Sequence, residues 1–305
     1  MKRLLALLLA TATLSCTALT GCQSAQADDG TPDKLIVAYM PNEETTEIVD
    51  AKNGFASQLS EKLGIDVVEL SVNDYNAAIE AMRTGQADMA FMGALSFCIA
   101  YERANAVPLA MLADNGDKSQ ATYNSVLVAR SDNDEINSIQ DVKGKSIAFA
   151  DPNSTSANLI PSAEIMKAFE DENLTMEDLH TNGSFFETSI YSGSDLAGLL
   201  AVEMGDVDLA AVADMSLQRT IDSGEVNAED LKVIHTSAPI PSACMAIRAD
   251  FPQEMQDQIQ EFLISYDDPV YFKSVMDGEN KRFVPCTVED YEGIIELNKK
   301  LNPTE

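Results

Sequence analysis

One pattern occurs in two distant parts of the chain: an apolar, helix-like run ends in glycine, and a strand-like run begins around an aspartate three residues later. The first copy is Ala81–Asp88 and the second is Ala201–Asp208. Glycine is common at helix ends because it adopts the left-handed backbone conformation without steric cost. The repeated pattern therefore predicts two similar α/β lobes.

Strand-like and helix-like segments alternate around the first copy, and short turns containing glycine separate them. This alternation is typical of a parallel sheet covered by helices. Predicted strands lie at 34–40, 65–70, 88–93, 109–114, 123–129, 146–150, 207–212 and 232–234. Predicted helices lie at 46–63, 74–85, 97–105, 157–170 and 196–204, and the chain after residue 242 reads mostly as helix, over 252–265, 269–276 and 288–300. The sequence thus predicts an α/β fold.

The chain is strongly acidic. Its 305 residues include 50 acidic and 20 basic ones, and 45% of them are hydrophobic, as in a globular protein. Nucleic acid phosphates would repel such a body, so we expect no nucleic acid partner. The acidic residues are scattered along predicted helix faces, which favours a solvated surface over an acidic site.

The N-terminus of the chain consists of a short basic segment followed by an apolar run. Met1–Arg3 precedes an apolar run at 4–14, which has the length of a secretory signal and is too short to span a membrane. Leu19-Thr20-Gly21-Cys22 follows and resembles the lipobox of bacterial lipoproteins. The resemblance implies a signal peptide at 1–21, a lipid anchor on Cys22 at the extracytoplasmic face of a membrane, and a polar linker at 22–32. Cleavage elsewhere, with an ordinary Cys22, is the alternative.

Of the five cysteines, Cys16 lies in the predicted signal peptide and Cys22 is the predicted anchor, which leaves Cys98, Cys244 and Cys286. Their odd number and irregular spacing leave open whether any two form a disulfide, and the apolar surroundings of Cys98 and Cys244 favour buried thiols. The chain has no CxxC pair, and His180 and His235 are its only histidines. We therefore expect no metal site, no cofactor and no catalytic base, and hence a protein that is not an enzyme.

Three hydroxyl residues follow the predicted strand at 146–150, within Asp151–Ser156, just before the helical spacing that begins at Ala157. The first N–H groups of a helix have no partner within the helix, and the helix dipole is positive at that end. Together with the hydroxyls, these groups suit a tetrahedral oxyanion. The alternative is that Ser154 or Ser156 only caps the helix.

Several motifs in this order resemble the phosphate, phosphite and phosphonate substrate-binding proteins of ABC importers, from about Lys34 to about residue 290. The most specific is Asp151–Ser156, which is close to the Ser-Thr-Ser anion cradle of that family. Supporting motifs are Asp74-Tyr75, the segment 88–96, Tyr123 with Ser125-Val126, the phrase at 205–208, and Pro239-Ile240-Pro241.

The resemblance implies a two-lobed type II periplasmic-binding-protein (Venus-flytrap) fold with two strands at its hinge. Lobe 1 would comprise 33–122 and 241–305, lobe 2 would comprise 123–240, and closure of the cleft would bury a small oxyanion. The implied partner is the transmembrane permease of an ABC importer, and we expect a monomer. The expected ligand-binding residues are Ser154, Thr155, Ser156, Tyr75, Tyr123, Ser96, Asp195 and Asp214.

Asp195 departs from the family, which commonly has a histidine at this point of a Gly-Ser-His phrase. A carboxylate beside a doubly charged phosphonate would be repelled. Asp195 therefore points away, is protonated, or faces a ligand that is less anionic or carries a positive group. The expected function is import of a phosphonate, phosphite or phosphate, and a receptor for another solute, such as a sulfonate or a zwitterion, is the alternative.

Overall fold

The computed structural model describes residues 32–40 and 45–303. The predicted signal peptide and Cys22 lie outside the described residues. Within these two ranges, no helix is both long enough and apolar enough to cross a bilayer.

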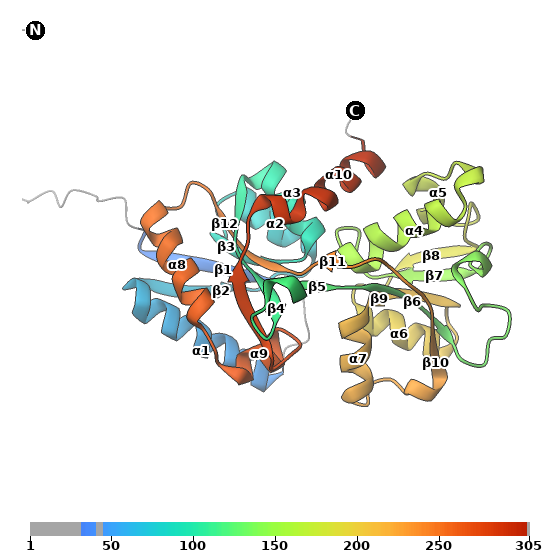
Figure 1. The fold of residues 1–305 in the computed structure, drawn as a ribbon, viewed down its shortest axis with the longest axis horizontal. Coiled ribbons are helices and arrows are strands. Elements are labelled where there is room, and N and C mark those ends of the chain that lie inside the picture. Colours follow the sequence, from blue (N-terminus) through green and yellow to red (C-terminus); the bar gives the residue numbers. More distant parts are fainter. Residues whose placement is uncertain (1–31, 41–44, 304–305) are drawn as a thin grey trace, which may run out of the picture. The chain divides into compact units, whose positions relative to one another are not determined.

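Two mixed sheets form the framework of the described chain (Figure 1). The strands of the first are β1 (Lys34–Tyr39), β2 (Asp66–Leu70), β3 (Met89–Met92), β4 (Ala106–Asp114), β12 (Cys244–Arg248) and β13 (Lys281–Pro285). The strands of the second are β6 (Ser125–Arg130), β7 (Ser146–Phe149), β8 (Thr188–Tyr191), β9 (Leu209–Ala213) and β10 (Leu231–Thr236). Their spatial orders are β13-β4-β12-β3-β1-β2 and β10-β6-β9-β7-β8.

A short antiparallel pair connects the two sheets. It consists of β5 (Thr122–Tyr123) and β11 (Ile240–Pro241), with Tyr123 opposite Ile240. The chain passes from the first sheet to the second through β5 and returns through β11. We call each sheet with its covering helices a lobe, the six-stranded one first. This is the predicted two-lobed type II fold with a two-strand hinge.

Helices cover both faces of each sheet, and four apolar clusters form the cores between the layers (Figure 1). On the first sheet, one face carries α1 (Thr46–Leu63), α8 (Gln253–Ser265) and α9 (Pro269–Val275), and the other carries α2 (Tyr75–Arg83), α3 (Ala94–Ala104) and α10 (Glu292–Leu301). On the second, one face carries α4 (Ile160–Ala168) and α5 (Met176–His180), and the other carries α6 (Asp195–Met204) and α7 (Asp214–Asp222).

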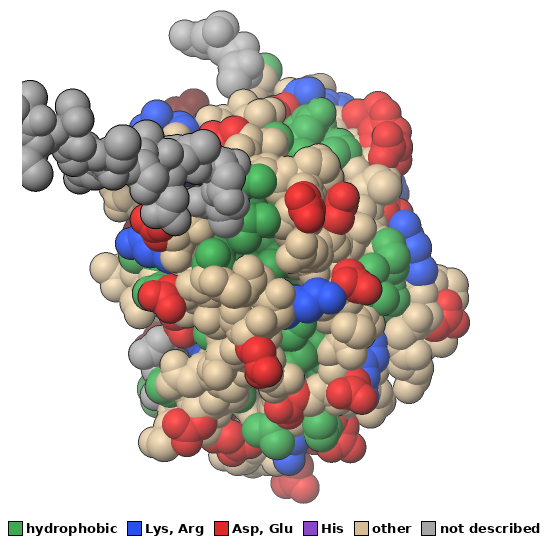
Figure 2. All heavy atoms as spheres, turned by 90° about the vertical axis from the view of Figure 1, so that its left-hand side faces the viewer, with side chains coloured by type: hydrophobic (Ala, Val, Ile, Leu, Met, Phe, Trp, Pro, Cys, Tyr) green, Lys and Arg blue, Asp and Glu red, His purple; other side chains and the backbone are tan. Residues whose placement is uncertain are grey.

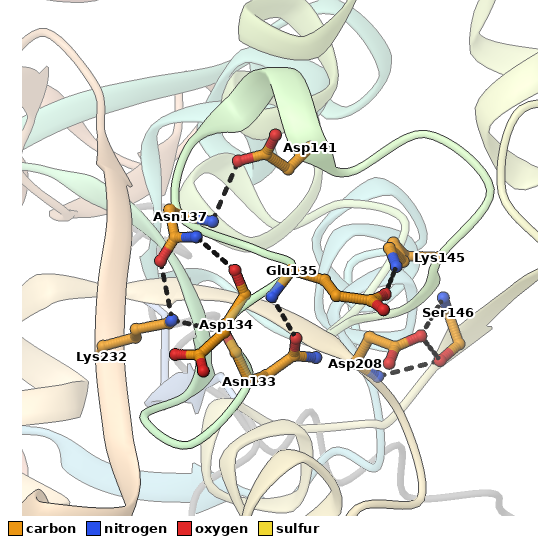
Figure 3. Close-up of polar contacts among 9 residues, drawn as sticks. All are labelled: Asn133, Asp134, Glu135, Asn137, Asp141, Lys145, Ser146, Asp208 and Lys232. Atoms are coloured by element: carbon orange, nitrogen blue, oxygen red, sulfur yellow. Dashed lines mark hydrogen bonds and ion pairs between the residues drawn. The ribbon is translucent and has the colours of Figure 1, made fainter.

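The repeated phrase has the same structural role in both lobes. Asp88, just before β3, accepts the Ile36 N–H of the neighbouring parallel strand β1 at 2.9 Å. Asp208, just before β9, accepts the Ser146 N–H of the neighbouring parallel strand β7 at 2.8 Å, as Figure 3 shows. The aspartate of each copy thus fixes the start of one strand against the next.

The polar turn after β6 is held by charged side chains at the edge of the second sheet (Figure 3). Lys232 Nζ donates to the Asn133 carbonyl at 2.6 Å, and Lys145 pairs with Glu135 at 2.8 Å. This turn lies in a part of the second lobe that contributes no residue to the cavity described below.

The acidic surface agrees with the solvated character predicted for it. On the face drawn in Figure 2, carboxylate side chains are dispersed rather than gathered into one patch. Several of them pair with cations, as Glu261 does with Lys62 at 2.6 Å and Glu80 with Arg83 at 2.7 Å.

The helices predicted after residue 242 are present as α8, α9 and α10, but β12 and β13, two strands of the first sheet, were missed. Helices cover both faces of the sheet at β12, which lies between β3 and β4, so its apolar run lacks the alternation that marks a half-buried strand. The three cysteines, Cys98, Cys244 and Cys286, are buried and free, which confirms the prediction of buried thiols for Cys98 and Cys244.

Candidate functional site

A cavity of about 160 Å³ lies between the lobes, beside the hinge. The first lobe and the hinge contribute Met40, Tyr75, Phe91, Gly93, Leu112, Tyr123, Ser242, Ala243, Val275, Met276 and Asp277. The second lobe contributes Ser154, Thr155, Ser156, Asp195, Ala213, Met215 and Ser216. Six of the eight predicted ligand-binding residues therefore line one cavity, and Ser96 and Asp214 do not.

Four helices and a π-helical turn present their N-terminal ends to this cavity. Tyr75 is the first residue of α2, Gly93 caps α3, Thr155 begins the π turn, Asp195 is the first residue of α6, and Ser216 lies in the first turn of α7. Each helix N-terminus carries a partial positive charge. Since none of the described lining residues is lysine, arginine or histidine, uncharged donors and helix ends supply the positive potential.

The hydroxyl motif forms a π turn, Thr155–Leu159, rather than the regular helix start that was predicted. The first hydrogen bond of the turn runs from the Leu159 N–H to the Ser154 carbonyl, at 3.1 Å. The N–H groups of Thr155 and Ser156 come earlier in the chain and take no part in the bonding of the turn. Ser154 Oγ accepts the Ala157 N–H at 3.1 Å, which makes Ser154 a helix cap as well as a cavity residue.

The hydroxyl of Thr155 contacts the opposite lobe. Its Oγ1 accepts the Leu95 N–H of α3 at 2.9 Å. A hydroxyl has one proton to donate, and an oxygen that already accepts an N–H leaves that proton for another partner. The bonds to Ser154 and Thr155 therefore leave each of them an O–H to donate at the cavity wall, and the hydroxyls of Thr155 and Ser156 lie within hydrogen-bond reach of the Tyr123 phenol.

Two tyrosines face the motif from the first lobe and the hinge. Burial raises the pKa of Tyr123 to about 12, although the neighbouring hydroxyls of Ser156 and Thr155 favour its anion. Burial, followed by the carboxylate of Asp195, raises the pKa of Tyr75 well above its ordinary value. Both phenols are consequently neutral near pH 7 and have an O–H to donate.

Asp195 lines the cavity, and its carboxylate raises the pKa values of Tyr75 and Tyr123, so it lies near these two phenols rather than away from the predicted site. Its Oδ2 accepts the Ala213 N–H at 3.1 Å, and the Ser216 hydroxyl also donates to the carboxylate. Desolvation nevertheless raises the pKa of Asp195 above its ordinary value, and nearby Asp277 adds to that rise. A carboxyl group with a raised pKa thus stands among the donors.

Ser96 and Asp214 make contacts of another kind. Ser96 Oγ donates to the Asn153 carbonyl at 3.0 Å, which joins α3 to the loop before the π turn. The Asp214 carboxylate accepts its neighbour's N–H, that of Met215, at 2.8 Å. In this arrangement Ser96 holds the two lobes together, and Asp214 stabilises the start of α7.

A second cavity of about 330 Å³ adjoins the first and shares Tyr75, Asp195, Ser216 and Asp277 with it. Arg219 lines this second cavity, and its Nε lies 3.1 Å from Asp277 Oδ1 across the lobes. Sequence reasoning missed Ser216, Arg219 and Asp277. The only signal near them is the Asp277-Gly278 pair, which is typical of a turn and indicates no ligand.

Among the described residues, no group of three or more His, Cys, Asp or Glu side chains is arranged to hold a metal ion. His180 stacks on Tyr191, with ring centroids 5.3 Å apart, and His235 lies 3.5 Å from Glu164. Neither histidine is a lining residue of the cavity.

Comparisons with known proteins show that this chain is similar to substrate-binding proteins of transporters. The family model described as "ABC transporter, phosphonate, periplasmic substrate-binding protein" matches residues 37–291. The phosphate-import protein PhnD of Mycolicibacterium smegmatis is 26% identical over 293 residues, which cover 92% of this chain and 89% of that protein. The phosphonates-binding periplasmic protein of Escherichia coli is 30% identical over 228 residues, which cover 73% of this chain and 63% of that protein.

The solved structure of PhnD1 from Prochlorococcus marinus in complex with methylphosphonate has the same fold. Its TM-score is 0.74 at 21% identity, and the match covers 90% of this chain and 100% of that one. A binding protein component of an ABC phosphonate transporter from Pseudomonas aeruginosa gives a TM-score of 0.72 at 23% identity, over 87% of this chain and 85% of that one.

Proposed function

Because the chain belongs to the family of periplasmic substrate-binding proteins of phosphonate ABC transporters, we propose that it captures a small phosphorus oxyanion in the interlobe cavity and delivers it to a permease. The candidate ligands are a phosphonate, phosphite and phosphate. The relatives named above are transport-associated binding proteins, so we expect stoichiometric binding without turnover.

The observation that carries this proposal is the convergence of uncharged donors on one cavity. The hydroxyls of Thr155 and Ser156, and the N–H groups at the start of the π turn, face the phenols of Tyr75 and Tyr123. Donors of this kind hold an oxyanion without a cationic side chain when helix N-termini supply the field. We assign the oxyanion's oxygens to these groups.

The remaining wall suits a short organic substituent or a P–H group. Met40, Phe91, Leu112 and Met276 are apolar, and they line the cavity from the first lobe. An apolar wall with a few convergent polar groups is the usual composition of a small-molecule site.

The lobes are already joined around this cavity, which supports a binding cycle of closure and opening. The bonds Leu95–Thr155 and Ser96–Asn153 and the ion pair Arg219–Asp277 all cross between them. In the proposed cycle a bound oxyanion adds further cross-lobe bonds, and separation of the lobes at the permease releases the ligand.

We also propose that Cys22 carries the lipid anchor at the extracytoplasmic face of the membrane. The support is the lipobox-like Leu19–Cys22 sequence after the apolar run, together with the periplasmic location of the family. Expression of the full chain with a labelled fatty acid should label the wild type and leave Cys22→Ala unlabelled and outside the membrane fraction. Equal labelling of the two would rule out the anchor.

A second candidate function is a receptor for a zwitterion or a sulfonate. The observation that favours a zwitterion is the position of Asp195 in the cavity wall, where a carboxylate could pair with a positive group of the ligand.

Thermal shift and isothermal titration with residues 32–305, which include both sheets and all four cores, separate these functions. The panel is phosphate, phosphite, methylphosphonate, aminoethylphosphonate and methanesulfonate. A ligand at a hundredfold excess over its Kd stabilises a protein by about 2.7 kcal/mol. We expect phosphite or methylphosphonate to bind. Binding by methanesulfonate or aminoethylphosphonate alone would favour the second candidate.

The double variant Thr155→Ala with Ser156→Ala tests the site. We expect it to lose binding, whereas Ser162→Ala with Thr220→Ala, which removes two buried hydroxyls outside the cavity, should bind as the wild type does. Unchanged affinity of the first double variant would remove the hydroxyl motif from the mechanism.

A further inference from the structure

The carboxyl group of Asp195 stands in the wall of the cavity where the oxyanion is assigned. It belongs to the first residue of α6, and the two donors that it has, Ala213 N–H and the Ser216 hydroxyl, lie on the second lobe beside it. A carboxyl group has more acceptor positions than two donors occupy. The rest of its hydrogen-bonding capacity is open to a ligand in the cavity.

The charged and titratable groups around Asp195 do not neutralise a carboxylate and an anion together. Tyr75 and Tyr123 face it as neutral phenols, and Asp277 approaches from the first lobe as a further acid. Arg219 favours the Asp195 carboxylate, but it is paired with Asp277 at 3.1 Å and with Glu225 at 3.6 Å. Lys52, which lines the adjoining cavity, is paired with Glu69 at 2.8 Å. A fully ionised Asp195 and a dianion would therefore repel each other, and the paired cations would offset little of that repulsion.

We propose that Asp195 and the bound oxyanion share one proton, so that the site selects oxyanions with an ionisable P–OH group. This inference rests on the proposed function and names the ligand's ionisation state. One O–H···O hydrogen bond would join the two groups, and the pair would carry one negative charge fewer than it would without that proton. Charge-assisted hydrogen bonds of this type are short and strong.

The chemistry of phosphorus oxyanions suits this arrangement. Their second ionisation lies close to neutral pH, at about 6 for a phosphate monoester. Below that pH the proton arrives on the ligand, and above it solvent supplies the proton as the complex forms. A sulfonate has no proton to share near neutral pH, so its binding would require protonation of Asp195 itself. Desolvation already raises the pKa of Asp195, which lowers the cost of keeping a proton there.

Isothermal titration tests the shared proton directly. Methylphosphonate and phosphite are titrated into residues 32–305 at about pH 6 and about pH 9, in pairs of buffers with different ionisation enthalpies. At the higher pH we expect uptake of close to one proton per ligand, with affinity that falls by up to about tenfold per pH unit. Methanesulfonate should bind far more weakly than methylphosphonate.

Asp195→Asn keeps the size of the side chain and cannot ionise. We expect it to fold, to bind the dianion at pH 9 without proton uptake, and to show a much flatter pH dependence. Asp222→Asn removes the same charge from an exposed position at the end of α7 and should behave as the wild type does.

The possible failures are distinguishable. Binding of phosphite or methylphosphonate with no proton uptake, or with equal uptake by Asp195→Asn, would overturn the shared proton and leave the proposed function in place. Methanesulfonate binding as tightly as methylphosphonate would overturn the selection. No binding of any phosphorus oxyanion would overturn the proposed function and this inference together.

Discussion

Thr155 Oγ1 accepts the N–H of Leu95 at 2.9 Å, and this bond joins the π turn of the second lobe to the first turn of α3 in the first. The same hydroxyl keeps a proton for a ligand. Closure of the lobes and orientation of a binding-site donor thus depend on one side chain.

Thr155→Val keeps the shape of this side chain and removes both hydrogen bonds. A hydrogen bond to a charged group contributes about 1.5–3 kcal/mol, so we expect the affinity for methylphosphonate to fall between about tenfold and a hundredfold in isothermal titration. Thr220→Val is the matched control, since Thr220 is buried in α7 and its hydroxyl donates to the Leu217 carbonyl. Equal losses in the two variants would point to general destabilisation.

The Arg219–Asp277 pair should act as a cross-lobe bond rather than as a ligand contact. Because both side chains are only partly exposed, at 34% and 24%, we expect each single variant, Arg219→Gln or Asp277→Asn, to weaken binding by several fold. The double variant should lose little more than either single one, because the two residues share one interaction. Losses that add in the double-mutant cycle would contradict the pairing.

Asp195 should make the ligand-free protein less stable at neutral pH. Desolvation holds the pKa of this carboxyl above its ordinary value, so the folded state binds more protons than the unfolded chain between the two pKa values. Stability therefore falls as the pH rises from about 4 through that window.

The Asp195→Asn variant should not show this fall in stability with rising pH. In urea unfolding we expect a higher free energy of unfolding at about pH 7.5, by about 1.4 kcal/mol for each unit of pKa shift, and little change at about pH 3.5. A variant that is less stable than the wild type at both pH values would show that the carboxylate contributes to the fold.

Asp208 and Asp88 offer a test of the fold that is independent of any ligand. Asp208→Ala leaves the N–H and the hydroxyl of Ser146 without their acceptor, so we expect a loss of about 1–3 kcal/mol in urea unfolding. Asp88→Ala should cost a similar amount through the Ile36 N–H. Asp206→Ala, a change of the same type that removes neither bond, is the control.

The repeated phrase and the hydroxyl motif were sufficient to predict two lobes and the hydroxyl part of the cavity wall, because both depend on local sequence. A glycine after a helical run predicts the end of a helix, and hydroxyls after a buried strand predict the start of the next helix. Neither prediction needs knowledge of distant contacts. Tyr75 and Tyr123 came from the family resemblance rather than from any pattern of their own.

The remaining features depend on distant contacts. β12 was not recognised as a strand because helices bury both faces of the first sheet, which removes the alternation of apolar and polar residues that marks a half-buried strand. Asp277 reaches the cavity only because the two lobes meet, and Arg219 comes from a helix, α7, that was not predicted. The direction in which Asp195 points could not be read from its place in a Gly-Ser-Asp phrase.

A crystal structure of residues 32–305 with methylphosphonate tests the central claim most directly. The account predicts phosphonate oxygens within about 3 Å of the Thr155 and Ser156 hydroxyls and of the Tyr75 and Tyr123 phenols, with one oxygen against the carboxyl group of Asp195. Methylphosphonate bound elsewhere in the protein, with these hydroxyls bonded only to protein atoms, would contradict it.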